Sequence, residues 1–225
     1  MGNPVTNQLL RGFSHYEEGE ASLEKARDVA QQLIANSRHD PQFGEYTSIE
    51  IVCTHFLHTN YFISERYLHC PNSHCIHHSN DYNAILCRGL QHESIGQWVL
   101  TETHHAHTSC GACGHASVIK LRFHRSPPLF VFSFPESTIR IDTSFDMVIQ
   151  NCSDKYTLIA IVYYGGQHFT SQVIMHDGRL WFYDGMQIAD LNTLPFLEYV
   201  GSIHCGPNLQ VCRGNRVCAA IYAKM

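Results

Sequence analysis

Long hydrophobic runs are missing from this sequence, and so are clusters of basic residues. No stretch approaches the roughly eighteen consecutive apolar residues of a membrane-spanning helix, and the N-terminal residues lack the basic-then-apolar pattern of a secretory signal. Lys and Arg number 15 against 20 Asp and Glu, for a net charge of −5. No basic stretch offers a footprint for nucleic acid. We therefore expect a cytoplasmic or nuclear protein that binds neither membrane nor nucleic acid.

Internal repeats, low-complexity tracts and long linkers are also missing, so 225 residues read as one domain with a sizeable core. The abundant residues are unusual: the chain has 10 Cys and 17 His. Without a secretory signal we expect the cysteines to be reduced, and closely spaced cysteines to bind metal rather than form disulfides.

Helical patterns come first and strand patterns later. Residues 20–40 carry an amphipathic stripe, and a capping box at Thr47 to Glu50 opens a second helical stretch. Residues 68–82 and 107–117 read as turn-rich loops, with a short helix between them around Trp98. Strand patterns then follow over 118–124, 129–134, 137–142, 156–164, 168–176, 179–183 and 217–224. This order predicts an α+β fold with a mostly antiparallel sheet.

Two cysteine pairs have the spacing of a metal site. Cys110-Gly-Ala-Cys113 lies on a glycine-rich turn, and Cys70 is followed by Cys75. Four thiolates that converge on one ion form a structural zinc site, and glycine allows the tight turn that this needs. The neighbouring His74, His77, His78 and His115 are possible substitutes. The alternative is a pair of surface loops with unpaired cysteines.

One histidine and one aspartate could form part of a catalytic site. The stretch YTLIAIVYYGGQHFTSQVIMHDGRLWFYDG places His168 after a double glycine and Asp184 at the end of a later strand. An Asp-Gly turn at 177–178 predicts a hairpin of 168–176 with 179–184. Counting from this turn places residue 184 a few positions from 171, and a twist or bulge could bring Asp184 toward His168. A thiol protease needs such an imidazole and a polar group that orients it, but both residues could equally be ordinary turn and edge residues.

These stretches, in this order, resemble the ubiquitin-specific proteases. The string around His168 and Asp184 is similar to the histidine box of that family, in which Gly-His-Tyr stands where this chain has Gln167-His168-Phe169. GEYTSIEIVCTHFLHTN at 44–60 lies where the family has its Gln-Gln-Asp-Ala helix. CPNSHC and CGAC resemble the two metal-binding pairs of its fingers subdomain, and VCAAIYAKM resembles its closing strand. The resemblance covers residues 44–225.

The resemblance implies a papain-like α+β fold with an incomplete thumb. Residues 1–66 would be the helical remnant of the thumb, 67–117 zinc-binding fingers, and 118–225 the antiparallel palm. The partner would be ubiquitin or a ubiquitin-like protein. His168 and Asp184 would be catalytic, and Gly165, Gly166 and Gln167 would bind the modifier's tail. The four cysteines Cys70, Cys75, Cys110 and Cys113 would hold structural Zn²⁺.

The nucleophile of that family is missing. Its Gly-Asn-Thr-Cys-Tyr box has no counterpart, and no cysteine precedes Cys53, which falls in the apolar stripe of a predicted helix. The chain could be a piece of a longer enzyme, a pseudoenzyme that still grips ubiquitin, or an enzyme that recruits Cys87 or Cys152. We expect this chain to be inactive by itself, so whether it is an enzyme stays open. The rival hypothesis is a zinc-stabilised scaffold or interaction domain with no affinity for ubiquitin.

Overall fold

The fold is described from a computed structural model. The described residues are Val29, Gln32 and Leu33, followed by 64–72, 76–81, 94–100, 103–134, 140–184, 197–205 and 208–225. The chain divides into two compact units, Met1–Phe62 with Tyr82–Ala84, and Ile63–Asp81 with Ile85–Met225. The three described residues of the first unit are helical, within the stretch for which the sequence predicts a helix. The predicted helix around Cys53 lies outside the described residues.

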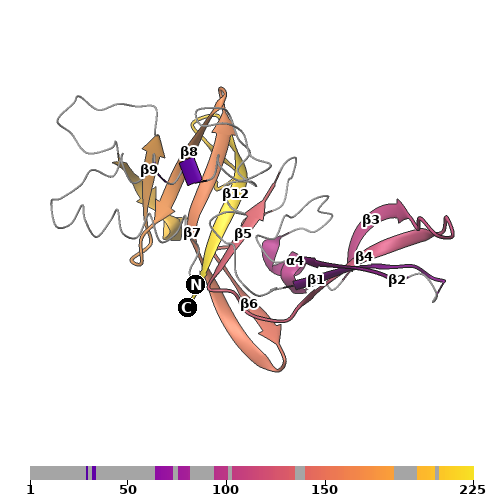
Figure 1. Cartoon of the computed structure of the whole chain (residues 1–225). Coiled ribbons are helices and arrows are strands. Elements are labelled where there is room, and N and C mark those ends of the chain that lie inside the picture. Colours follow the sequence, from indigo (N-terminus) through magenta and orange to yellow (C-terminus); the bar gives the residue numbers. More distant parts are fainter. Residues whose placement is uncertain are drawn as a thin grey trace. The chain divides into compact units, whose positions relative to one another are not determined.

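A four-stranded antiparallel sheet forms one part of the second unit (Figure 1). Its order is β2-β1-β4-β3, and its strands are β1 (Ser64–His69), β2 (Ile76–Asp81), β3 (Thr103–Ser109) and β4 (Ala116–Phe123). The sequence predicts turn-rich loops over the whole of β2 and over the last residues of β1 and β3, and that prediction is wrong. These segments are rich in His, Ser and Thr and lack an alternation of apolar residues. Only β4 therefore shows a strand pattern in the sequence, and the strands next to it could not be predicted.

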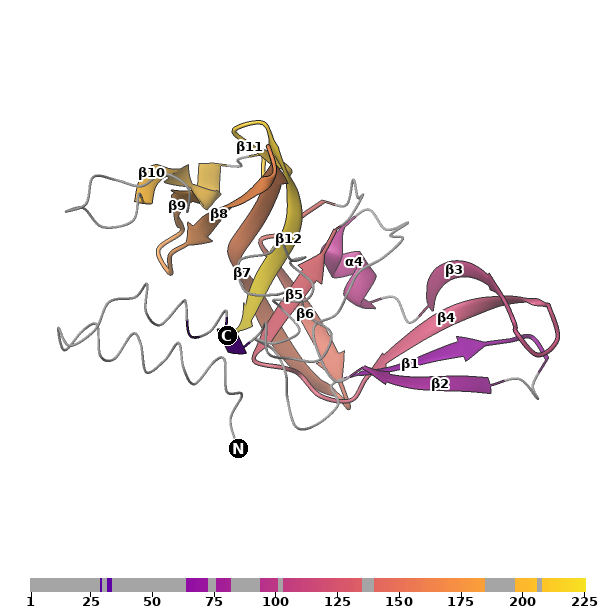
Figure 2. The same ribbon diagram turned by 45° about the horizontal axis from the view of Figure 1, so that its top comes forward.

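An eight-stranded antiparallel sheet forms the other part (Figure 2). Its strands are β5 (Leu129–Ser133), β6 (Ser144–Ile149), β7 (Cys152–Gly165), β8 (His168–Ile174), β9 (Arg179–Asp184), β10 (Leu197–Ser202), β11 (Val211–Cys212) and β12 (Asn215–Lys224). The main path is β10-β9-β8-β7-β12-β11, with β5 paired to β12 and β6 to β7. The antiparallel sheet predicted from the sequence is confirmed.

One predicted strand does not form over its described residues, and three strands of this sheet, β6, β10 and β11, were not predicted. Residues 140–142 of the predicted strand 137–142 form only a single parallel bridge, from Arg140 to Ser94. The strand β6 follows instead, and it pairs with the first half of β7 from Ser144↔Thr157 to Ile149↔Cys152. Tertiary pairing overrides a short alternating pattern when a long neighbouring strand offers a full ladder.

Aromatic side chains fill the core on one face of the eight-stranded sheet. Phe130 of β5 contacts Tyr156 of β7 with ring centroids 4.7 Å apart, and Phe145 of β6 stacks on Tyr156 at 5.2 Å. The hydroxyl of Tyr156 donates to the Pro127 carbonyl at 2.6 Å, so the buried ring keeps a partner for its polar end. Phe132 is fully buried within this cluster.

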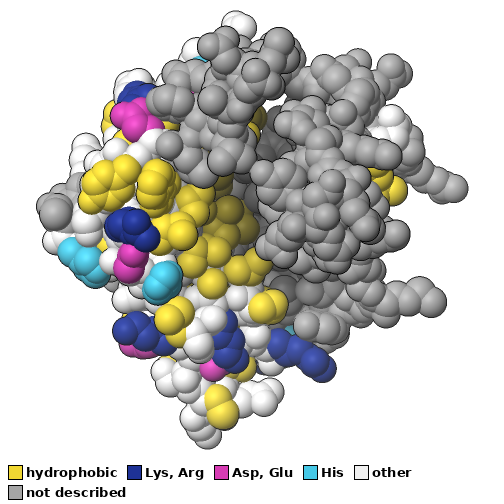
Figure 3. Space-filling view, turned by 90° about the vertical axis from the view of Figure 1, so that its left-hand side faces the viewer, with side chains coloured by type: hydrophobic (Ala, Val, Ile, Leu, Met, Phe, Trp, Pro, Cys, Tyr) yellow, Lys and Arg dark blue, Asp and Glu magenta, His cyan; other side chains and the backbone are white. Residues whose placement is uncertain are grey.

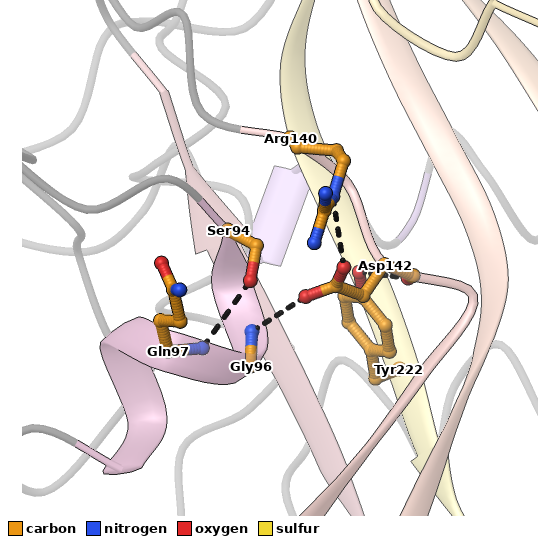
Figure 4. Close-up of polar contacts among 6 residues, drawn as sticks. All are labelled: Ser94, Gly96, Gln97, Arg140, Asp142 and Tyr222. Atoms are coloured by element: carbon orange, nitrogen blue, oxygen red, sulfur yellow. Dashed lines mark hydrogen bonds and ion pairs between the residues drawn. The ribbon is translucent and has the colours of Figure 1, made fainter.

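The short helix α4 (Ile95–Leu100) packs Ile95 and Trp98 into the same core. Two acceptors satisfy its first N–H groups (Figure 4): Asp142 Oδ2 accepts from the Gly96 N–H at 2.8 Å, and Ser94 Oγ accepts from the Gln97 N–H at 3.3 Å. A cap of this kind stabilises a helix start by about 1 kcal/mol. Tyr222 of β12 donates to the Asp142 carbonyl at 2.6 Å and so fixes the capping residue to the sheet. No helix in the described ranges is long and apolar enough to cross a membrane.

Candidate functional site

His168 and Asp184 lie side by side on the inward face of the eight-stranded sheet. His168 begins β8 directly after the turn of Gly166 and Gln167, and it is the cross-strand partner of Gly165. Asp184 ends β9 opposite Thr170, and β8 and β9 pair with no register shift. Residues 168 and 170 point to the same face because side chains alternate along a strand. The pair is therefore diagonal, and the predicted hairpin brings the two residues together with no register shift between β8 and β9.

The two side chains approach closely without forming a hydrogen bond. His168 Nε2 lies 3.5 Å from Asp184 Oδ1, and the side chains are 27% and 11% exposed. Within the described part of the chain, the buried Nε2 has no hydrogen-bond partner. A carboxylate that faces Nε2 favours the tautomer with the proton on that nitrogen, which leaves Nδ1 as an acceptor. We call these two residues the histidine–aspartate pair.

The turn before His168 has the backbone of a tight hairpin. Gly166 has φ 57° and Gln167 has φ 67°, as in the type I′ turns that join two strands through two residues. Glycine adopts this left-handed conformation without cost, whereas Gln does so less readily. At Gly165 a Cβ atom would overlap the amide of Asn215, so the missing side chain leaves room for that amide. The binding of a substrate tail by Gly165, Gly166 and Gln167 stays a prediction.

Sequence reasoning missed the polar residues behind the pair. Asn215 Nδ2 donates to Thr170 Oγ1 at 3.3 Å, next to the histidine–aspartate pair. One step further along β8, Gln172 accepts from the Tyr163 hydroxyl at 2.8 Å and donates to Cys212 Sγ at 3.4 Å. Burial raises the pKa of Cys212, so this thiol is a poor nucleophile. No local motif marks these residues, because strand pairing alone brings them together.

Neither cysteine considered as a substitute nucleophile gains support. Cys152 opens β7 and Gly165 closes it, so about 40 Å of strand separates Cys152 from the turn before His168. Cys87 lies outside the described residues.

Three of the four predicted metal ligands converge at one end of the four-stranded sheet. The Sγ atoms of Cys70, Cys110 and Cys113 all lie within 4.8 Å of one another, and Cys70 Sγ is 3.3 Å from Cys113 Sγ. Cys70 follows β1, while Cys110 and Cys113 lie on the turn between β3 and β4. Thiolates about 2.3 Å from a tetrahedral zinc ion lie at comparable mutual distances. The predicted fourth ligand, Cys75, lies outside the described residues.

The turn that carries Cys110 and Cys113 is built to hold a thiolate. The backbone N–H groups of Ala112 and Cys113 donate to Cys110 Sγ and lower the pKa of this thiol from 9.0 to about 6. The Gly114 N–H closes the turn on the Cys110 carbonyl at 2.7 Å, and Gly114 has φ 73°. Cys70 and Cys110 are each 2% exposed. These three residues, called the cysteine cluster below, fit a metal site, and the described part of the chain does not identify the metal.

No protein-family model and no curated relative matches the sequence. Three solved structures share the fold at 10–12% sequence identity. A yeast SAGA DUB module with a mutant Sgf73 aligns over 95% of this chain and 52% of its own, with a TM-score of 0.50. A Ubp8-variant/Sgf11/Sus1/Sgf73 DUB module aligns over 98% of this chain and 59% of its own, with a TM-score of 0.55. A Ubp8-Sgf11-Sgf73-Sus1 SAGA DUB module aligns over 94% of this chain and 50% of its own, with a TM-score of 0.51.

The chain thus spans between half and three fifths of the length of the chains that it matches. Identity at this level establishes the fold and leaves the activity to be argued from the site. Ubp8 is a deubiquitinase of the ubiquitin-specific protease type, so the resemblance expected from the sequence is confirmed for the fold. The protein is similar in fold to the ubiquitin-specific protease type of deubiquitinase.

Proposed function

We propose that this chain recognises ubiquitin or a ubiquitin-like protein through a domain of the ubiquitin-specific protease type. The observation that carries the proposal is the histidine–aspartate pair, because its two residues occupy the positions that the histidine box implies and lie 3.5 Å apart. Asp184 holds the proton on Nε2 and leaves Nδ1 of His168 free to accept one. The pair is thus arranged as a general base and the residue that orients it.

The pair supplies proton transfer only. Given a cysteine from another segment, Nδ1 would take the thiol proton, the thiolate would attack the isopeptide carbonyl, and His168 would return the proton to the leaving amine. Water would then release the bound carboxyl group. The chain has no Gly-Asn-Thr-Cys-Tyr box, so we expect binding without turnover when it is alone.

Structural Zn²⁺ held by the cysteine cluster and Cys75 would complete the domain as zinc-binding fingers. Burial of Cys70 and Cys110 and the N–H donors to Cys110 support this assignment. The ion would cross-link the ends of β1, β3 and β4 and take no part in proton transfer. Residues 67–117 would then be the fingers and 118–225 the palm.

A second candidate function is an interaction domain without affinity for ubiquitin. The outward face of β7 to β10 exposes Tyr164 (48%) and Tyr199 (54%), and Phe169 lies beside Tyr164 with ring centroids 4.9 Å apart. Hydrophobic side chains gather on the side of the molecule where β9 lies in Figure 1 (Figure 3). An exposed apolar patch is typical of a protein-binding surface.

The experiment that separates these functions uses two forms of ubiquitin. A ubiquitin with a cysteine-reactive C-terminal group, followed by intact mass, tests for a nucleophile, and calorimetry with unmodified ubiquitin tests for binding. We expect no adduct, and binding that weakens in His168→Ala and on removal of zinc. Cys152→Ser is the control, with unchanged binding. An adduct mapped to any cysteine would overturn the inactivity, and absence of binding at millimolar ubiquitin would favour the interaction domain.

A further inference from the structure

A single amide contacts both of the cross-strand pairs that carry His168 and Asp184. Asn215 opens β12, and its Nδ2 donates to Thr170 Oγ1 at 3.3 Å. Thr170 is the direct partner of Asp184. On its other side the Asn215 amide fills the space that a Cβ on Gly165 would need, and Gly165 is the direct partner of His168.

We propose that Asn215 is a positioning residue that sets the geometry of the histidine–aspartate pair. The 3.5 Å between Nε2 and Oδ1 lies just beyond the usual range of a charge-assisted hydrogen bond. At this separation a shift of a few tenths of an ångström decides whether the bond forms. The amide lies against the partner of each residue, so it fixes how far the turn before His168 stands from the end of β9.

Asn215 can do this because its own backbone is held rigidly. It pairs with Cys212 across a two-residue turn in which Arg213 and Gly214 have φ 51° and 83°. Arg213 stacks over the Phe182 ring at 4.1 Å and forms an ion pair with Glu198 of β10. Cys212 accepts from Gln172. The turn is therefore attached to β8, β9 and β10, the strands on the pair's side of the sheet.

The chemical consequence is the position of one proton. With the pair held together, the proton stays on Nε2 and Nδ1 remains the acceptor that the proposed function requires. Without the amide, Thr170 loses its donor and a void opens over Gly165, so the imidazole can move from Asp184 and the two tautomers approach the ratio of an unpaired ring. The inference rests on the proposed function for its purpose, but the tautomer can be measured without ubiquitin.

The test is a long-range ¹H–¹⁵N correlation spectrum of the full chain labelled with ¹⁵N-histidine, at about pH 8, where ordinary imidazoles are neutral. His168→Gln identifies the signal among the 17 histidines, and Asp184→Ala gives the ratio of an unpaired ring. We expect Asn215→Ala to lower the Nε2–H to Nδ1–H ratio several-fold, towards the Asp184→Ala value, because the negative charge that favours a proton on Nε2 would then lie farther away.

Two further variants separate positioning from packing. Val211→Ala truncates an exposed residue of β11 beside the same turn that is not one of its anchors, and it should leave the tautomer ratio unchanged. Gly165→Ala combined with Asn215→Ala places a methyl group in the space that the amide vacates. This double variant should recover thermal stability relative to Asn215→Ala while its tautomer ratio stays low, because it restores the filling but not the donor to Thr170.

An unchanged ratio in folded Asn215→Ala would overturn the inference, as would an equal change in Val211→Ala, which would indicate general loosening of the sheet. Recovery of the ratio in the double variant would also overturn it, since filling alone would then suffice. If Asp184→Ala itself leaves the ratio unchanged, the pairing that carries the proposed function fails as well, so the two failures are distinguishable.

Discussion

The two sheets of this chain are stabilised in different ways. The eight-stranded sheet buries a cluster of aromatic rings, with Phe132, Tyr156 and Tyr222 all at most 1% exposed. In the four-stranded sheet, three of the strands lack apolar alternation. Its described buried residues include Ser64 and Ser117 in addition to Cys70 and Cys110. Hydrophobic burial therefore stabilises the first sheet, and we infer that a metal cross-link stabilises the second. The difference teaches that strands without apolar alternation can form here beside a strand that has it, with three cysteines gathered at their ends.

The strongest way to break this contrast is to remove the metal. We expect Cys110→Ser to abolish stoichiometric zinc binding and to expose the amides of β1 and β4 to hydrogen exchange, while those of β7 and β12 stay protected. In isolated zinc-finger peptides the metal contributes about 10–16 kcal/mol at neutral pH, so its loss should strongly weaken this end of the molecule, while the strand ladder leaves some residual protection. Metal analysis combined with hydrogen exchange makes the measurement.

Cys152→Ser is the control for metal loss, since Cys152 is exposed at the start of β7 and far from the cluster in the chain. If Cys110→Ser retained zinc, or if hydrogen exchange rose equally in both sheets, the two sheets would not be stabilised in different ways.

A cavity in the aromatic core should destabilise the eight-stranded sheet. Phe132→Ala removes a fully buried ring that contacts Trp98, Phe145 and Tyr222. We expect the free energy of unfolding to fall by about 3–5 kcal/mol, measured by denaturant titration, with zinc still bound before the transition. Phe169→Ala is the matched control, because Phe169 is 39% exposed and its truncation should change stability by no more than about 0.5 kcal/mol. Equal losses in the two variants would count against an aromatic core as the main source of stability.

In the metal-free protein we expect a smaller effect, a dependence of the stability of the β3–β4 turn on pH. The pKa of Cys110 is lowered from 9.0 to about 6 by the N–H donors of Ala112 and Cys113. A lowered pKa in the folded state stabilises the fold fully above the unfolded value, and this contribution is lost as the pH falls from 9 towards 6. We therefore expect protection of the β3–β4 turn to decrease over that window in hydrogen-exchange experiments corrected for intrinsic rates. Cys110→Ala should remove this dependence, and its persistence there would assign it to another group.

The sequence predicted the proximity of His168 to Asp184 and the convergence of three cysteines better than it predicted the strands β1, β2 and β3. Apolar runs at β5, β7 and β12 and the Asp-Gly turn were visible because periodicity and turn chemistry are local signals. The positions of His168 and Asp184 followed from that turn together with the family resemblance. Three cysteines of the predicted four converge, since their spacing already implied a shared ion.

What escaped prediction depends on pairing between distant segments. The roles of Thr170 and Asn215 arise only when β12 lies along β7, which no local pattern announces. The strands β1, β2 and β3 have no apolar alternation of their own; β1 and β3 pair with β4, and β2 pairs with β1. Such residues can be found by strand pairing and not by motif.

The comparison of the two regions extends to their tight turns, and here we expect the smallest effect. In the cysteine turn the residue with φ 73° is Gly114, whereas before His168 a glutamine, Gln167, holds φ 67°. A side chain in this left-handed region costs about 1 kcal/mol relative to glycine. Gln167→Gly should therefore raise the free energy of unfolding by somewhat less than that, because glycine also gains freedom in the unfolded chain.

Gln167→Ala is the matched control for that turn, since it removes the same side chain but keeps the Cβ atom at the strained φ. Thermal and denaturant unfolding of the two variants compare them directly. If Gln167→Ala is as stable as Gln167→Gly, then backbone strain is absent and the glutamine side chain itself was the cost. If only the glycine variant gains, the residue before His168 is strained for a reason other than stability, which is the behaviour of a position kept for contact with a ligand.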